Sequence, residues 1–399
     1  MYTATRDLML PTTVTGSWPR PSWYTLGLSG RPLSSGMNDV AFREQFTDAL
    51  DTVISDQERA GLDILTNGDY HQDPDLGGRS WVLYPVERLS GMSQLDISAT
   101  DEWVYPPGTI LNEVMGGWRY PVVEGELGEG VPLEYAKVWR LAQQRTDRPV
   151  KIGTVSAQVA VSCTPLQTDH YKGDKHQAMW DMATAFNKEL RALAAAGCKV
   201  IQIEEPMLHL AATAGDRGEV DFLVDAFNHE ISGLEDVEVW IHTCWGNPNM
   251  QKVTQDTSYA DAVELYMERA HGDVWTLEFK DNDPLATAKL FDRYDGKLPK
   301  KVALGMVSHR TLQVESPDEV AADVRLALEH MGPEHLVLSS NCGFGRQGFN
   351  RLVAFYKSTS LAQGANIVRR ELGLPETHVR AADPELQTDV PARVSAPLA

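Results

Sequence analysis

Cysteine is scarce in this chain, and basic residues and long apolar runs are also few. Only 4 of the 399 residues are Cys, and 36 Lys and Arg stand against 56 Asp and Glu, which gives a net charge of −20. This charge repels the phosphate backbone of nucleic acid and the surface of an anionic membrane, so we expect neither partner. No apolar run approaches the roughly 20 residues that span a bilayer. With so few thiols we expect no disulfide scaffold, and we place the chain in the reducing cytoplasm.

A phosphate-binding glycine loop finds no support either, because no G-x-G-x-x-G follows the first expected strand and no G-x-x-x-x-G-K-[ST] occurs. The sequence does contain eight short β-branched or apolar runs that alternate with amphipathic stretches, a pattern typical of βα units around a parallel sheet. The runs cover residues 12–17, 62–68, 151–156, 199–204, 238–243, 274–279, 301–308 and 336–341. Eight such units in a chain of this length predict an α/β fold of the (β/α)8 TIM-barrel class.

We expect residues 1–380 to form a single barrel domain. Residues 70–130, rich in Gly, Pro and aromatics after the second expected strand, predict an excursion over the barrel mouth, with short strands near 81–86 and 118–123. Residues 381–399 are rich in Pro and Ala without periodicity and predict a flexible tail. Elsewhere, Ser316 followed by Pro317 and Glu319 predicts the capped start of a helix.

Polar residues gather where the expected strands end, which is where TIM barrels carry their active sites. His242 and Cys244 lie two residues apart, so they point the same way in an extended segment. Together with Glu278 and Cys342, which end other strands, they form a His, Cys, Cys, Glu set suited to tetrahedral zinc. An isolated pair would be better explained by a hydrogen-bonded histidine and a buried cysteine. The shared position at strand ends favours the metal.

Further candidates follow the same expected strands. Glu204 and Glu205 come directly after an apolar strand, where a charge needs a partner. We expect Glu204 to meet a ligand and Glu205 an internal ion pair, and Asp69 admits the same two interpretations. His309 is either a proton donor or a loop histidine.

At these residues the chain resembles the catalytic half of the cobalamin-independent methionine synthase family. The similar segments, in chain order, are TGSWPRP (15–21), AGLDILTNGD (60–69), VIQIEEP (200–206), HTC (242–244), VWTLE (274–278) and NCG (341–343). The resemblance implies a TIM barrel with a catalytic zinc ion. The zinc ligands that it implies are His242, Cys244, Glu278 and Cys342. The residues that it implies for the amino-acid part of homocysteine are Ser17, Asp69 and Glu204, with His309 as the candidate acid.

Three features depart from the family pattern. The chain has room for one barrel, whereas full-length members carry two. The stretch at 153–160 (GTVSAQVA) lacks the Trp that stacks on folate in the family, and Asp69 and Glu204 stand where the family usually has Glu and Asp.

We therefore expect a zinc-dependent thiol S-methyltransferase that converts homocysteine to methionine, with a small-molecule thiol and an alkyl donor as partners. Epoxide opening, as in epoxyalkane:coenzyme M transferase, and a non-catalytic zinc protein are the alternatives. The sequence leaves the methyl donor and the oligomeric state open.

Overall fold

A parallel sheet forms the centre of the molecule. The computed structural model describes residues 2–74, 79–93, 105–254, 258–345 and 348–386. Within them, seven parallel strands follow one another in the order β1-β4-β5-β6-β7-β8-β9. Their bounds are β1 (Leu65–Thr66), β4 (Val150–Val155), β5 (Val200–Glu204), β6 (Glu238–Thr243), β7 (Val274–Glu278), β8 (Lys301–Val307) and β9 (Leu336–Ser340). From the third run onward the predicted strands are confirmed within a few residues, and so is the parallel α/β arrangement.

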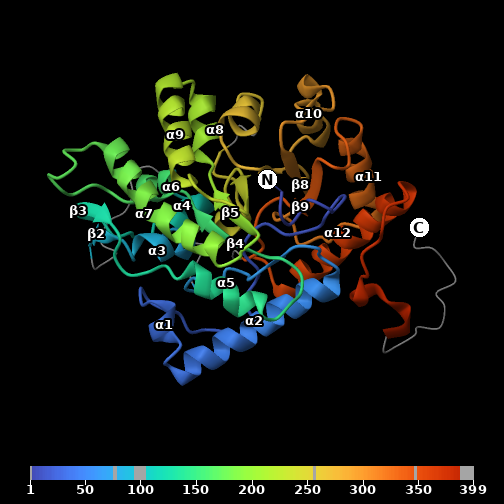
Figure 1. Ribbon diagram of the computed structural model, residues 1–399, viewed down its shortest axis with the longest axis horizontal. Coiled ribbons are helices and arrows are strands. Elements are labelled where there is room, and N and C mark those ends of the chain that lie inside the picture. The colour runs from blue at the N-terminus through green and yellow to red at the C-terminus, as the bar shows by residue number, and fades with distance from the viewer. Residues whose placement is uncertain (1, 75–78, 94–104, 255–257, 346–347, 387–399) are drawn as a thin grey trace.

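Helices cover the outside of this sheet (Figure 1). The longer ones are α2 (Val40–Ala60), α5 (Tyr135–Gln143), α7 (Lys175–Ala195), α9 (Arg217–Glu230), α11 (Pro317–Leu328) and α12 (Arg351–Glu371). The shorter ones are α1 (Leu33–Gly36), α6 (Ala157–Cys163), α8 (Met207–Ala214) and α10 (Pro284–Lys289). Helix α11 begins with the predicted capping box, in which Ser316 and Glu319 each accept the backbone N–H of the other. Among the described residues no helix has the length and apolar character needed to cross a membrane.

The first expected strand is not a regular strand. Thr12 forms an isolated parallel bridge with Leu338 of β9, and on its other side its carbonyl accepts the N–H of Ile64 (3.1 Å). The ladder then stops, because the N–H of Thr15 donates to the side chain of Ser340 (2.9 Å) and not to a backbone carbonyl. This segment therefore bridges β9 and the residues before β1. A curled parallel sheet is confirmed, whereas a complete (β/α)8 barrel stays a prediction.

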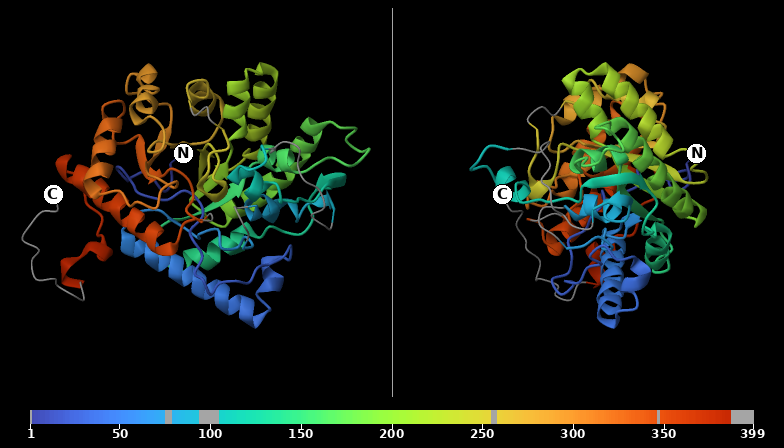
Figure 2. Two further views of the ribbon diagram at one scale, coloured as in Figure 1. Left: turned by 180° about the vertical axis from the view of Figure 1, so that it is seen from behind. Right: turned by 90° about the vertical axis from the view of Figure 1, so that its left-hand side faces the viewer.

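The excursion after β1 holds α3 (Ser80–Val86), β2 (Ser90–Met92), α4 (Ile110–Met115) and β3 (Val123–Gly128). Strands β2 and β3 form a two-stranded antiparallel sheet, which lies at the end of the molecule opposite the C-terminus (Figures 1 and 2). The strand predicted near 81–86 is wrong, because a short, wholly apolar run does not separate a strand from a buried helix. The strand predicted near 118–123 begins only at Val123.

The excursion packs against segments that follow two strands of the main sheet. Helix α3 contacts α6, and α4 contacts the short 3-10 turn at Pro248–Met250. These segments come after β4 and β6, so the excursion lies close to the strand ends that carry the predicted site. Of the expected tail, residues 387–399 lie outside the described residues, and Pro384–Leu386 forms a 3-10 turn.

Candidate metal centre and substrate cavities

Two sulfur atoms and an imidazole meet at the carboxyl ends of β6 and β9. The ligand atoms of His242, Cys244 and Cys342 all lie within 4.8 Å of one another, and the two sulfurs are 3.7 Å apart. Two sulfurs bound at about 2.3 Å to one tetrahedral zinc ion lie about 3.8 Å apart, so this pair fits zinc. Neither ring nitrogen of the buried His242 has a hydrogen-bond partner among the described residues, although Glu204 Oε2 lies 3.4 Å from Nε2. These three side chains suit a metal site.

The charges of this cluster are coupled. Contact with the Cys244 thiol holds the pKa of Cys342 well below its usual value, against the effect of burial. The same contact, together with burial, raises the pKa of Cys244. Burial lowers the pKa of His242, but Glu204 and Cys342 more than offset this effect and raise it overall. The two thiols therefore share one proton, which a metal bound to both sulfurs would release.

Glu278, the fourth predicted ligand, lies beside the cluster and is held by other partners. Its Oε1 accepts the backbone N–H of Trp245 (2.9 Å) and an N–H of the Arg310 guanidinium (2.7 Å). Its Oε2 is buried and has no hydrogen-bond partner among the residues described. Burial raises the pKa of Glu278 to about 7, although Arg310 opposes this shift. The carboxylate forms a second group with Asp281 and His309, whose ligand atoms lie within 4.8 Å of one another.

His309 is fully buried in this second group. Its Nδ1 lies 3.8 Å from Asp281 Oδ2, and the same oxygen accepts hydrogen bonds from Ser308 Oγ and Asn341 Nδ2, both at 2.8 Å. Asp281 is thus fixed by two donors and faces the imidazole. Burial lowers the pKa of His309 to about 3, so its ring is neutral at neutral pH.

Two carboxylates converge on Gly16. A Cβ atom at this glycine would lie 3.4 Å from Asp69 Oδ2 and 3.8 Å from Glu204 Oε1. The φ of Gly16 is +60°, which is a conformation that glycine adopts without strain. Ser17 follows directly, and its hydroxyl accepts the N–H of Gly345 (3.1 Å). The structure therefore gathers all three residues predicted to hold the amino-acid substrate.

A chain of buried side-chain hydrogen bonds, here called the relay, holds Glu204. Gln202 Nε2 donates to Glu204 Oε1 (2.8 Å), and Lys151 Nζ donates to Gln202 Oε1 (2.8 Å). Only 1% of Lys151 is exposed, and this burial lowers its pKa to about 7. The relay fixes the orientation of the Glu204 carboxylate.

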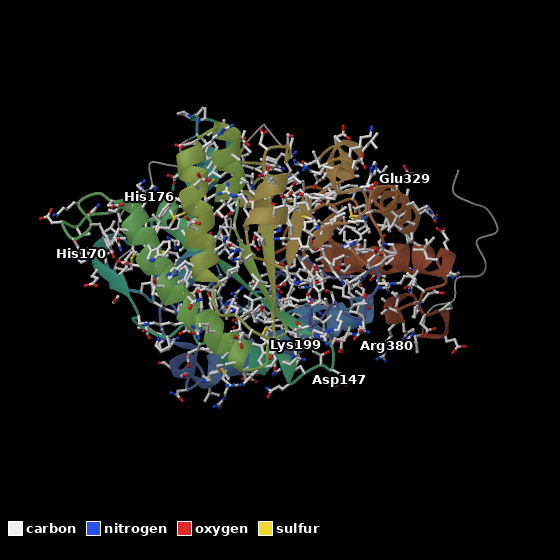
Figure 3. All side chains as sticks on the ribbon, turned by 45° about the horizontal axis from the view of Figure 1, so that its top comes forward. Asp147, His170, His176, Lys199, Glu329 and Arg380 are labelled. Carbon is white, nitrogen blue, oxygen red and sulfur yellow. The ribbon has the colours of Figure 1, made fainter. Side chains whose placement is uncertain are left out.

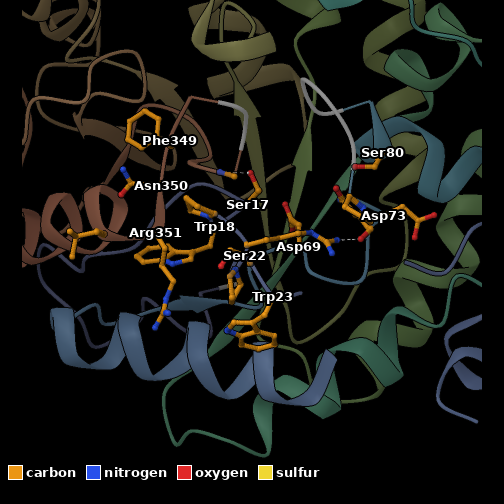
Figure 4. A pocket seen from close by; sticks show the side chains of 18 residues that line it. Ser17, Trp18, Ser22, Trp23, Asp69, Asp73, Ser80, Phe349, Asn350 and Arg351 are labelled. Carbon is orange, nitrogen blue, oxygen red and sulfur yellow. Dashed lines mark hydrogen bonds between the residues drawn. The ribbon is translucent and has the colours of Figure 1, made fainter. Parts of the chain in front are cut away.

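Two cavities adjoin these groups. The larger, of about 560 Å³, has Ser17 and Asp69 on its inner side and Trp23 nearer α2 (Figure 4). The smaller, of about 110 Å³, is lined by Cys244, Cys342 and Glu204 together with apolar side chains of the excursion. The cluster of His242, Cys244 and Cys342 therefore borders a small apolar cavity, and the predicted amino-acid site borders a larger and more polar one.

Sequence reasoning missed several residues of the site and misjudged one. Arg310 follows the predicted His309, and Asp281 comes three residues after Glu278, so proximity to a predicted ligand was the available signal. Glu205 meets no cation; instead it accepts the N–H of Leu208 and the hydroxyl of Tyr266, both at 3.2 Å. The expected ion pair is wrong: the start of α8 and Tyr266 bind one oxygen of this carboxyl group, and burial raises its pKa to about 7, so that it is partly neutral.

Cys198 and two of the histidines lie away from the site. Cys198 is buried, donates to backbone carbonyls and belongs to no metal-ligand group among the described residues. Two histidines, His170 and His176, lie at the outer edge of the molecule (Figure 3). The predicted metal cluster thus draws on the residues at the strand ends.

Comparison with known proteins places this arrangement in a family. The family profile described as "Cobalamin-independent synthase, Catalytic domain" matches residues 10–359. Methionine synthases from Sulfurisphaera tokodaii and Sulfolobus acidocaldarius are each 28% identical to the chain, over 91% of its length and 94% of theirs.

Solved structures share the fold. A B12-independent methionine synthase from Shewanella sp. W3-18-1, in complex with selenomethionine, matches with a TM-score of 0.69 at 23% identity, covering 92% of this chain and 99% of that one. A putative vitamin-B12 independent methionine synthase from Listeria monocytogenes matches with a TM-score of 0.62 at 16% identity, covering 91% and 99%. The profile match over most of its length shows that the chain belongs to the cobalamin-independent methionine synthase family, as a form of its catalytic domain.

Proposed function

We propose that this chain is a zinc-dependent methyltransferase that methylates the thiol of homocysteine and so forms methionine. The proposal is carried by the sulfur pair, 3.7 Å apart, in a site where Glu204 is shared with the carboxylate pair at Gly16. A thiol-bearing amino acid needs both features, because a metal binds its sulfur and carboxylates bind its ammonium group.

The proposed metal ligands are His242, Cys244 and Cys342, with Glu278 as the fourth. When bound, zinc would supply Lewis-acid stabilisation of the substrate thiolate, whose pKa is otherwise about 8.5. Arg310 and the N–H of Trp245 already bind Glu278, so they would hold this carboxylate beside the metal if it were not a metal ligand.

The amino-acid part of the substrate would be bound by residues of this chain alone. Asp69 and Glu204 would accept hydrogen bonds from the ammonium group, and Ser17 Oγ would donate to the carboxylate. The relay from Lys151 through Gln202 keeps Glu204 in place. These contacts orient the thiol for in-line attack on a methyl carbon.

The methyl donor requires either a good leaving group or an acid. For a donor whose leaving group must be protonated, we assign the acid role to His309, which faces Asp281 at 3.8 Å and, being neutral when buried, would first have to take up a proton. We also propose that residues 1–380 form one domain, in which residues 11–15 complete an eight-stranded barrel and the excursion covers the mouth. The proposed thiolates call for a reducing compartment such as the cytoplasm.

The second candidate is the opening of an epoxide by the thiol of coenzyme M. One observation favours it: Arg20 Nη1, at the larger cavity, is buried without a hydrogen-bond partner among the described residues and could bind a sulfonate. Asp69 and Glu204 oppose it, because two carboxylates repel a sulfonate and suit an ammonium. A non-catalytic zinc protein would need neither the carboxylates nor the cavities.

Zinc analysis combined with thiol binding tests the proposal. We expect about one zinc ion per chain, loss of that zinc in Cys342→Ser, and full zinc content in the control Cys198→Ser. We expect the zinc-loaded protein to bind homocysteine more tightly than coenzyme M. A wild-type protein without zinc affinity, or a Cys342→Ser variant with full zinc content, would overturn the metal site. Preference for coenzyme M would favour the second candidate.

A further inference from the structure

The small cavity beside the sulfur pair has an aromatic wall. Its lining includes Cys244, Cys342 and Glu204, together with Trp81, Trp118 and Tyr120 of the excursion. Trp118 and Tyr120 meet edge to face, with ring centroids 6.4 Å apart and planes at 85°. Each ring carries a negative π-face, and a face that is turned to the cavity would attract a positive charge there.

The charge of this cavity has one sign. Its described lining includes Glu204 but no Lys or Arg, and because a bound zinc ion would offset the two proposed thiolates, Glu204 is the group that keeps the lining negative. Indole and phenol rings attract a cation through their negative faces, and aromatic cages recognise quaternary ammonium groups in this way. A neutral or anionic occupant would gain nothing from either feature.

Two buried polar atoms at the cavity have no hydrogen-bond partner among the described residues: Asn247 Oδ1 and Trp118 Nε1. Asn247 is only 8% exposed and is held by a hydrogen bond from its Nδ2 to Gly343 O (2.8 Å). Its free oxygen can accept weak hydrogen bonds from the polarised C–H groups of a methyl on a positively charged atom. The free N–H of Trp118 suits a carboxylate carried by the same molecule.

From these observations we propose that the cavity binds the methyl donor and that this donor is a small carboxylate-bearing onium compound, with its methyl on a positively charged sulfur or nitrogen. This inference rests on the proposed function and names the second substrate. Size supports it, because an apolar cavity of about 150 Å³ accepts benzene. The 110 Å³ found here therefore admits a sulfonium or ammonium group and leaves little room for a fused bicyclic carrier.

The transfer balances without a proton. The substrate thiolate forms a bond to the methyl carbon, and the bond from that carbon to the onium atom breaks. The electron pair stays on the departing sulfur or nitrogen, which leaves as a neutral thioether or amine. An onium donor thus asks nothing of His309 as an acid.

Binding to the zinc-loaded protein tests the occupant through matched pairs of probes. Dimethylsulfonioacetate is compared with 3-methylbutanoate, and glycine betaine with 3,3-dimethylbutanoate, so that each pair differs in the positive charge and hardly in shape. Calorimetry should give at least about tenfold tighter binding for one or both onium probes. The substitution Trp118→Leu should remove this preference, whereas Trp180→Leu, a surface change on α7 where the indole stacks on His229, should preserve it.

Methyl transfer from ¹³C-labelled probes to homocysteine then separates the sources, since only the true class of donor yields labelled methionine. Equal binding of charged and neutral probes, or a preference that survives Trp118→Leu, would overturn the inference. So would transfer from a neutral donor when neither onium probe binds, and the proposed function would then stand. Preferential onium binding without methylation of homocysteine by any donor would support an onium site in the cavity, but would overturn the proposed function and with it the donor role.

Discussion

Replacing Arg310 by Met tests whether the guanidinium holds Glu278 beside the metal cluster. The two groups lie 2.7 Å apart, the carboxylate is fully buried, and the arginine side chain is 13% exposed. At this distance the attraction is about 6 kcal/mol for an effective dielectric constant near 20. Breaking a buried pair by removing one partner typically costs about 3–5 kcal/mol, because desolvation offsets part of the attraction.

Protonation of Glu278 limits this cost in the metal-free protein. Its pKa is about 7 with Arg310 present and rises further without it. At pH 6 the carboxyl group is therefore mostly neutral, and the variant loses little more than one hydrogen bond, about 1 kcal/mol. At pH 9 the wild-type pair is charged, and we expect the loss to approach about 3 kcal/mol.

Urea denaturation of the metal-free protein measures this coupling. The wild type, Arg310→Met, Glu278→Gln and the double variant form a double-mutant cycle at pH 6 and pH 9. Lys280→Met is the control, since Lys280 pairs with Asp323 and not with Glu278. A coupling energy that is absent, or equal at the two pH values, would refute the reasoning. In the zinc-loaded protein we expect Arg310→Met to weaken homocysteine binding, because Glu278 is then free to stay on the metal.

Three further changes test other parts of the site. Gly16→Ala should raise the KM for the amino-acid substrate, because its Cβ would face both carboxylates. The control Gly173→Ala, at a similar positive φ with no neighbour within 4 Å, should lower stability alone. Equal KM values for the two variants would contradict this prediction. Burial and Glu205 raise the pKa of Glu230 from 4.5 to about 8. The wild type should therefore lose up to about 5 kcal/mol of stability as the pH rises between these values. Urea denaturation at pH 5.5 and 8.5 should show a smaller loss for Glu230→Gln. Parallel pH profiles for Glu230→Gln and the control Glu219→Gln, whose side chain is partly exposed, would exclude this effect. His309→Gln should retain transfer from an onium donor within about tenfold and lose at least about 100-fold with a donor that needs protonation, as single-turnover rates would show.

The positions of strands β4 to β9 could be predicted from the sequence. The runs that became β4 to β9 are continuous and apolar, as expected of parallel strands buried on both faces. The first run failed because the Ser340 side chain takes the N–H of Thr15, and no local pattern announces such a bond. The helix α3 was missed because its apolar run is buried on all sides, which removes the periodicity that identifies a helix.

The site residues at the strand ends could be predicted from the sequence, whereas those in loops and in the excursion could not. His242, Cys244 and Cys342 could be expected together because parallel strands bring their carboxyl ends to one edge. The end of β7 also places Glu278 there, but its contact with Arg310 could not be predicted, because it depends on the conformation of the loop after β8. The aromatic cavity was also out of reach, because it requires the excursion to fold back over β4 and β6.

The central claim is that a zinc ion on two cysteine sulfurs accepts the thiol of homocysteine. X-ray absorption at the zinc edge of the loaded protein tests it directly. We predict two sulfur neighbours for the protein alone and three after homocysteine is added, with loss of one oxygen neighbour in exchange. A sulfur count that homocysteine leaves unchanged, or a metal without sulfur neighbours, would contradict the account.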